Sequence, residues 1–148
     1  MEKTTILLAV LLLGGCTSRN EQMIRQYTAK EAACIEAYRT GDVHTASVAL
    51  QKYLALISEY DARGMKGLHY NLAKAMVEAR LSLVYKQSGK SDMAIQFHNS
   101  AMQHYGVTNQ QGEAKFLALI DSLDQNMGVT WRKQDGPPTD AVAASHGQ

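Results

Sequence analysis

GMKGLHYNLAKAMVEARLSLVYKQSGKSDMAIQFHNSAMQHY, residues 64–105, is the stretch that decides the fold. In its first half, apolar side chains recur at spacings of three and four, which places them on one face of a helix. These are Met65, Leu68, Leu72, Met76, Ala79 and Leu83. An adjoining face carries Val77, Leu81, Val84 and Tyr85. The pattern therefore predicts a helix from Met65 to Ser88 that contacts other helices on two sides.

A second helix is predicted from Ser91 to Tyr105. Gly89 can adopt the left-handed conformation that ends a helix, and Ser91 is placed to cap the next one. The expected buried face is narrower than that of the first helix and consists of Met93, Ala94, Phe97, Ala101 and Tyr105. Gln96, Asn99, Ser100 and Gln103 are expected to point to water. The two helices should fold back on each other as an antiparallel hairpin.

This hairpin resembles the tetratricopeptide repeat, a helix-turn-helix unit of about 34 residues. The residues at matching offsets are Leu81, Ser82, Tyr85, Gly89, Ala94 and Ala101. The sequence departs from the family at Glu78, where an aromatic side chain is common, and at His98, where the family prefers Phe. An unrelated helical hairpin with a glycine turn and small packing residues would carry similar residues. Both interpretations predict an all-α fold.

Three further helical patterns flank the hairpin. One runs from Glu21 to Thr40, a second follows Asp42, and a third runs from Gln110 or Glu113 to about Gln125. We therefore expect about five helices, arranged as antiparallel hairpins in a short array that resembles the tetratricopeptide family, within one domain over residues 21–127. Residues 128–148 contain two prolines and no helical stripe, so we expect a disordered tail. Trp131 in that tail could dock on the helices or contact a partner.

The first sixteen residues have the pattern of a lipoprotein signal. An apolar run from Ile6 to Leu13 is too short to cross a bilayer and is typical of a secretory signal peptide over residues 1–15. Leu13-Gly14-Gly15-Cys16 resembles the lipobox of bacterial lipoproteins, in which the cysteine becomes the acylated first residue, carrying fatty acids such as palmitate. By that resemblance Cys16 is the lipidation site and residues 16–20 are a tether. The alternative is an ordinary secreted protein with an incidental cysteine.

The same resemblance implies a location. In lipoproteins of Gram-negative bacteria, an aspartate after the lipidated cysteine often directs retention in the inner membrane. This chain has Thr17 there. We therefore expect a lipid-anchored protein of the cell envelope on the periplasmic face of the outer membrane.

Composition points away from several classes of function. The formal net charge is +1 and 20% of the residues are charged, without a basic patch that would indicate nucleic-acid binding. The histidines are not spaced as helical metal ligands, and no phosphate loop or nucleophile elbow is present. We interpret Glu78 with Arg80, and Asp121 with Asp124, as solvated faces rather than catalytic pairs. Cys34 is interpreted as a buried, inert thiol, with an intermolecular disulfide as the alternative. The sequence thus predicts no catalytic residues, metal or cofactor.

A protein-binding surface remains. In tetratricopeptide arrays the first helix of each unit lines a concave groove for a peptide or helix. By offset, the corresponding residues here are Met76, Ala79, Leu83, Lys86 and Gln87. The alternative is that the first helix, the fifth helix or the tail covers this face. We expect a membrane-anchored adaptor or envelope assembly factor. The alternatives are a self-associating structural envelope protein, for instance a homodimer, and more remotely a small envelope enzyme or inhibitor.

Overall fold

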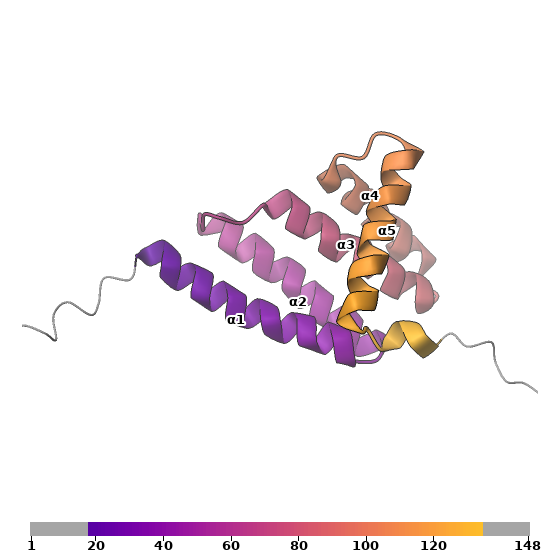
Figure 1. Cartoon of the computed structure of the whole chain (residues 1–148), viewed down its shortest axis with the longest axis horizontal. Helices are drawn as coiled ribbons and strands as arrows, with labels where there is room; N and C mark the ends of the chain where they lie inside the picture. The colour runs from indigo at the N-terminus through magenta and orange to yellow at the C-terminus, as the bar shows by residue number, and fades with distance from the viewer. Residues whose placement is uncertain (1–17, 135–148) are drawn as a thin grey trace, which may run out of the picture.

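The computed structural model describes residues 18–134, and this part of the chain is all-α (Figure 1). Five α-helices are followed by one short 3-10 helix, and no strand is present among the described residues. Their bounds are α1 Arg19–Thr40, α2 Val43–Ala62, α3 Tyr70–Gln87, α4 Ser91–Tyr105, α5 Gln110–Met127 and η1 Trp131–Gln134. The expected fold class and number of helices are confirmed. Within residues 18–134, no helix combines the length and apolarity needed to cross a membrane.

Helices α1 and α2 form an antiparallel hairpin. Ser18 caps α1, because its hydroxyl accepts from the backbone of Glu21 while the Glu21 carboxylate accepts from the Ser18 backbone N–H. The expected tether of residues 16–20 is therefore too long, and the helix begins two residues earlier than predicted. Gly41 ends α1, and Asp42 caps α2 through the backbone N–H of Thr45. Both caps are the ones predicted from the sequence.

Helix α3 is shorter than predicted. It begins at Tyr70, whereas the apolar spacing indicated Met65. The reason lies in the backbone: Gly64 and Gly67 have φ angles of +72° and +97°, which a right-handed helix does not contain. Residues 63–69 form a connection instead, and the side chain of Met65 reaches from this connection into the core.

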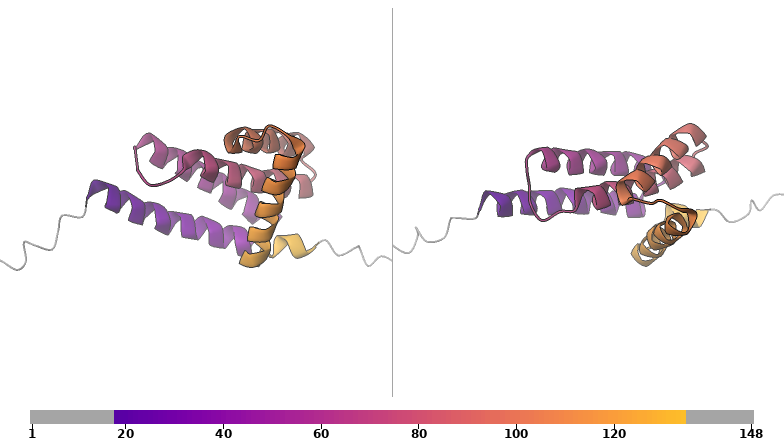
Figure 2. Two further views of the ribbon diagram at one scale, coloured as in Figure 1. Left: turned by 45° about the horizontal axis from the view of Figure 1, so that its top comes forward. Right: turned by 90° about the horizontal axis from the view of Figure 1, so that it is seen from above.

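Helix α4 begins and ends where the sequence predicts, at Ser91 and Tyr105. The predicted cap is wrong, because Lys90 occupies the N-cap position and makes no side-chain hydrogen bond there. Gly89 has the expected positive φ, +73°. Helix α5 is capped by Asn109 and Gly128 and crosses α3 steeply (Figures 1 and 2). It therefore packs across α3 and α4 instead of forming another parallel layer.

The core consists of two adjoining groups of side chains. The larger joins α1 to α4 and includes Tyr38, Ile57, Leu81 and Val84. The smaller lies under α5 and consists of Ala75, Ala79, Ala101, Phe116 and Ile120. The three alanines leave room for Phe116 and Ile120 to approach α3 and α4 closely.

Three residues predicted to be buried lie on the surface: the side chain of Leu72 is 41% exposed, that of Met93 37% and that of Tyr105 41%. All three are in the first or last turn of their helices. One face of the Tyr105 ring stacks on Phe116, with 4.0 Å between the ring centroids.

The chain remains packed beyond Met127. Val129 and Trp131 are buried, and Thr130 donates its backbone N–H to the Arg39 carbonyl over 2.9 Å. The expectation of disorder from residue 128 is therefore wrong for residues 128–134. This segment donates hydrogen bonds to a carbonyl at the end of α1 that has no partner within the helix. Trp131 packs on α1, which is the first of the two roles that the sequence left open for it. The predicted signal peptide, Cys16 and the rest of the predicted tail, residues 135–148, lie outside the described residues.

Candidate functional site

A buried ionic cluster joins three helices, α1, α3 and α5, to η1. Asp124 of α5 is fully buried. Its Oδ2 accepts from the Tyr38 hydroxyl over 2.6 Å, and its Oδ1 accepts from Arg80 Nε over 2.7 Å. Nη2 of Arg132 lies 2.8 Å from the same Oδ2, and Nη1 of Arg132 lies 2.5 Å from Asp121. We call Tyr38, Arg80, Asp124 and Arg132 the ionic cluster.

The cluster satisfies a charge that could not otherwise be buried. Removing a carboxylate from water costs several kcal/mol unless cations and hydrogen bonds replace its hydration. Two guanidinium groups and one phenol do so for Asp124. Burial, followed by the nearby Asp124 charge, raises the pKa of Tyr38, so this phenol stays protonated and remains a donor.

The prediction that Arg80 and Asp124 belong to solvated faces is therefore wrong. Both side chains are less than a tenth exposed, whereas Asp121 is exposed as predicted. The sequence around each residue did indicate that its side chain is buried. Asp124 follows Ile120 by four residues on the buried stripe of α5, and Arg80 lies in a helix that is apolar over much of its circumference. Charges in such positions must be paired across the interior.

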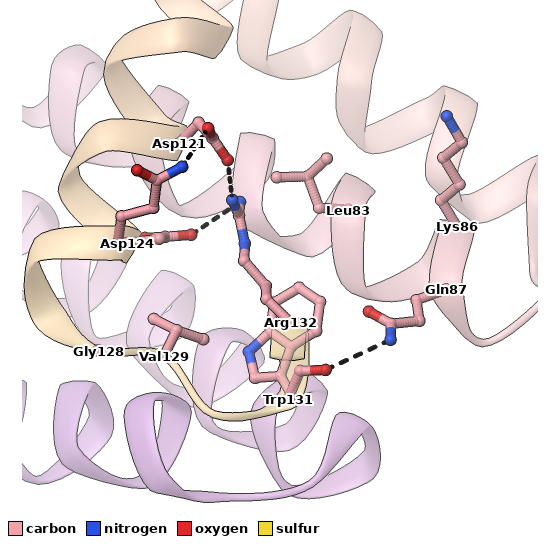
Figure 3. Close-up of a pocket in the computed structure, with 10 residues that line it drawn as sticks. Leu83, Lys86, Gln87, Asp121, Asp124, Gly128, Val129, Trp131 and Arg132 are labelled. Carbon is pink, nitrogen blue, oxygen red and sulfur yellow. Dashed lines mark hydrogen bonds and ion pairs between the residues drawn. The ribbon is translucent and has the colours of Figure 1, made fainter. Parts of the chain in front are cut away.

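An open cleft lies above the cluster. Its volume is about 700 Å³, and Figure 3 shows its lining from the last turns of α3, the last turns of α5 and η1. Apolar surface comes from Leu83, Val129 and Trp131, whereas Lys86 and Gln125 contribute polar groups. Gln87 Nε2 donates to the Trp131 carbonyl over 3.4 Å, which ties α3 to η1 across the cleft.

Trp131 forms one wall of this cleft and also contacts α1. Its ring packs edge-on against Tyr38, with 5.9 Å between the ring centroids. The indole N–H is buried and has no acceptor among residues 18–134. Packing, rather than a hydrogen bond from the indole, therefore holds the ring in place.

The five predicted groove residues divide into two groups. Leu83, Lys86 and Gln87 line the cleft together. Ala79 is buried under Phe116 and Ile120 of α5, and Met76 is half-buried beside them. The fifth helix thus covers the first half of the expected groove and leaves the second half open, so neither alternative from the sequence describes the whole face.

No family model, curated protein or solved structure matches this chain. Of the residues that carry the tetratricopeptide resemblance, Leu81, Tyr85, Ala94 and Ala101 are buried in the α3–α4 hairpin. The prediction that Glu78 belongs to a solvated face is wrong, because its side chain is 5% exposed.

Glu78 forms a second buried polar group with α4. Its Oε1 accepts from the Ser100 hydroxyl over 2.8 Å, and its Oε2 lies 2.7 Å from His104 Nδ1. Ser100, predicted to point to water, turns inward for this reason. The hydroxyl of Ser100 contacts the carboxylate and not the imidazole, so the three residues do not have the order of a nucleophile, base and orienting acid. They connect α3 to α4.

Within residues 18–134, no three His, Cys, Asp or Glu side chains lie close enough to hold a metal ion. His98 pairs with Glu113 over 3.1 Å between α4 and α5. Cys34 is partly exposed rather than fully buried, and burial raises the pKa of its thiol, which lowers its reactivity at neutral pH.

Proposed function

We propose that this protein is a non-catalytic adaptor, anchored to a membrane through a lipid on Cys16, that holds a polypeptide segment of an envelope partner in the cleft. The observation that carries the proposal is the position of Leu83, Lys86 and Gln87. The tetratricopeptide resemblance selected them as groove residues, and they line an open cleft between the last turns of α3 and α5.

The lining suits a peptide. Leu83 offers accessible apolar surface for side chains of a partner, over a floor formed by the largely buried Val129 and Trp131. Lys86 and Gln125 offer exposed polar groups at the edge. Such a combination of an apolar floor and a few polar groups is typical of binding clefts. The walls are also rigid, because the ionic cluster lies directly beneath them and fixes α5 and η1 to α3. A preformed cleft avoids part of the ordering cost of binding.

The location follows from the lipobox resemblance. A lipidated Cys16 followed by Thr17 favours the periplasmic face of the outer membrane, and we propose an assembly role there by analogy with helical-repeat lipoproteins. A Cys16→Ser variant should accumulate as the unprocessed, unlipidated precursor. An acylated product from that variant would contradict the anchor.

The cleft is tested by site-specific photocrosslinking in the cells that produce the protein. A photoreactive amino acid at position 86, in the cleft, should form an adduct with one envelope protein, and Leu83→Glu should abolish it. Position 115, exposed on α5 away from the cleft, is the control and should give no such adduct. The folded state of Leu83→Glu is checked by its helical circular dichroism. An adduct that survives Leu83→Glu in the folded protein would discard the cleft.

Self-association is the second candidate, and one observation favours it. Ile95 of α4 is 60% exposed, the largest exposed fraction among the large apolar side chains of residues 18–134. If position 86 crosslinks only to a second copy of this chain, and Ile95→Asp converts a dimer to a monomer in sizing experiments, a structural envelope protein becomes the better account.

A further inference from the structure

The end of the molecule where α1 begins is a single surface built from two parts of the chain. Figures 1 and 2 show the first turns of α1 beside the connection between α2 and α3. Asn20 joins them, because its Oδ1 accepts from the Lys66 backbone N–H over 2.8 Å and its Nδ2 donates to the Lys66 carbonyl over 3.4 Å. We call this surface the anchor end.

The anchor end carries cations that have no acidic partner among residues 18–134. Arg19, Arg25 and Lys66 are exposed and form no ion pair with any described residue. Two of the acidic side chains at the same end are paired with cations: Glu59 with Arg63 and Lys30, and Asp61 with Lys74. Glu21 accepts from the Ser18 backbone and keeps its charge. Three unpaired cations therefore outnumber one unpaired carboxylate, and the surface offered to an external ligand is net positive.

This surface also lies at the start of the domain, close to the proposed lipid. Only Thr17 separates Cys16 from the cap of α1. Two residues of chain reach at most about 7 Å. That distance is within a Debye length, about 8 Å at physiological salt, so charges at the anchor end would act on the headgroups of the bilayer.

We infer that the anchor end docks on anionic phospholipid headgroups of the membrane that holds the lipid. Arg19, Arg25 and Lys66 contact the phosphates, and Ile24, which is 39% exposed, contacts the interfacial region. The inference rests on the proposed lipid anchor and adds an orientation to it. An acyl chain alone fixes the distance of the domain from the bilayer but not which surface faces it.

Docking at this end places the cleft away from the membrane. From Arg19 to Tyr38 the axis of α1 extends roughly 29 Å, at about 1.5 Å per residue. Trp131 packs on Tyr38 at the far end of that helix. Helix α1 therefore acts as a spacer that presents the cleft to a partner roughly 30 Å from the headgroups when the helix stands upright.

The test uses the mature, lipidated full chain reconstituted in two kinds of vesicle. One contains phosphatidylcholine alone and the other an equimolar mixture with phosphatidylglycerol. A membrane-impermeant reagent acetylates exposed lysines, and mass spectrometry follows Lys66 at the anchor end and Lys115 on α5. In the anionic vesicles Lys66 should react about five-fold more slowly, whereas Lys115 should not change. Salt at about 1 M should remove the protection while the protein stays on the vesicles.

Paired variants separate docking from general electrostatic attraction. Arg19→Gln with Arg25→Gln should abolish the protection of Lys66. Lys86→Gln with Lys90→Gln removes the same charge away from the anchor end and should leave the protection unchanged. Equal reaction rates of Lys66 in the two vesicles would overturn the inference while a lipid mass on Cys16 still supports the anchor. Absence of that mass from the purified protein would overturn both.

Discussion

The α1–α4 hairpins and the region from α5 to η1 are held by different kinds of interaction. The hairpins meet through apolar side chains of neighbouring helices, such as Ile57, Leu81 and Val84. The region from α5 to η1 also packs apolar side chains on the hairpins, but it is attached in addition through the ionic cluster, whose members Tyr38 and Asp124 are 86 residues apart in sequence. The comparison shows that local apolar patterns build this bundle, whereas long-range polar contacts decide where its last helix lies and therefore which part of α3 stays open.

The largest expected effect comes from breaking the ionic cluster at its centre. Asp124→Ala should lower the free energy of unfolding by about 3–5 kcal/mol, because Arg80 would remain buried without its carboxylate. Denaturant unfolding followed by circular dichroism measures the change. Combining Asp124→Leu with Arg80→Met should recover much of the loss, because no unpaired charge is then buried. A single variant within about 0.5 kcal/mol of the wild type, the range of ordinary surface substitutions, would show that the cluster is dispensable.

A smaller effect is expected from removing one hydrogen bond of the cluster. Tyr38→Phe should lower the free energy of unfolding by about 2 kcal/mol at neutral pH, because the lost hydrogen bond has a charged carboxylate as its acceptor. Tyr27→Phe in the α1–α2 hairpin is the comparison, because Tyr27 does not contact the cluster. Its ring packs on Tyr60 with 5.5 Å between the ring centroids. If the two variants lose equal free energies of unfolding, the charged acceptor of Tyr38 contributes nothing to stability.

The same two tyrosines predict an alkaline limit to stability. Burial raises the pKa of Tyr27 to about 12 and also raises the pKa of Tyr38. A phenol whose pKa is raised on folding contributes stability that is complete below its unfolded pKa, about 10, and is lost as pH rises through its folded pKa. The wild type should therefore lose stability from about pH 10 upward, and each Phe variant should lose less over that range. Tyrosinate absorbance and circular dichroism should change together.

The smallest effect is expected from a helix cap in the hairpin region. Asp42→Ala removes the acceptor for the Thr45 backbone N–H, an interaction of 2.7 Å, and should cost about 1 kcal/mol. Because α2 lies outside the cleft and the ionic cluster, crosslinking from position 86 should be unchanged. Loss of that crosslink in the folded variant would mean that the hairpins and the cleft are more tightly coupled than the comparison suggests.

Sequence reasoning succeeded where the controlling interactions are local. Apolar residues once per turn predicted the helices, and Gly89 and Gly128 marked two of their ends. It failed at residues 65–69, where the apolar spacing continued through a segment in which Gly67, like Gly64 before it, adopts a positive φ. The spacing of apolar residues carries no information about backbone angles, and a glycine can adopt either the negative φ of a helix or a positive φ.

The sequence by itself therefore determined an all-α chain of five helices, because side-chain periodicity and turn residues act within a few positions of each other. Only the tertiary structure decided that Asp124, Arg80 and Glu78 are buried, that residues 128–134 belong to the domain, and that Leu83, Lys86 and Gln87 remain open while Ala79 is covered. The burial of Glu78 depends on its contacts with Ser100 and His104 of α4. The other outcomes depend on where α5 and η1 pack against α1 and α3. Those contacts join residues far apart in the chain, among them one buried carboxylate and two arginines.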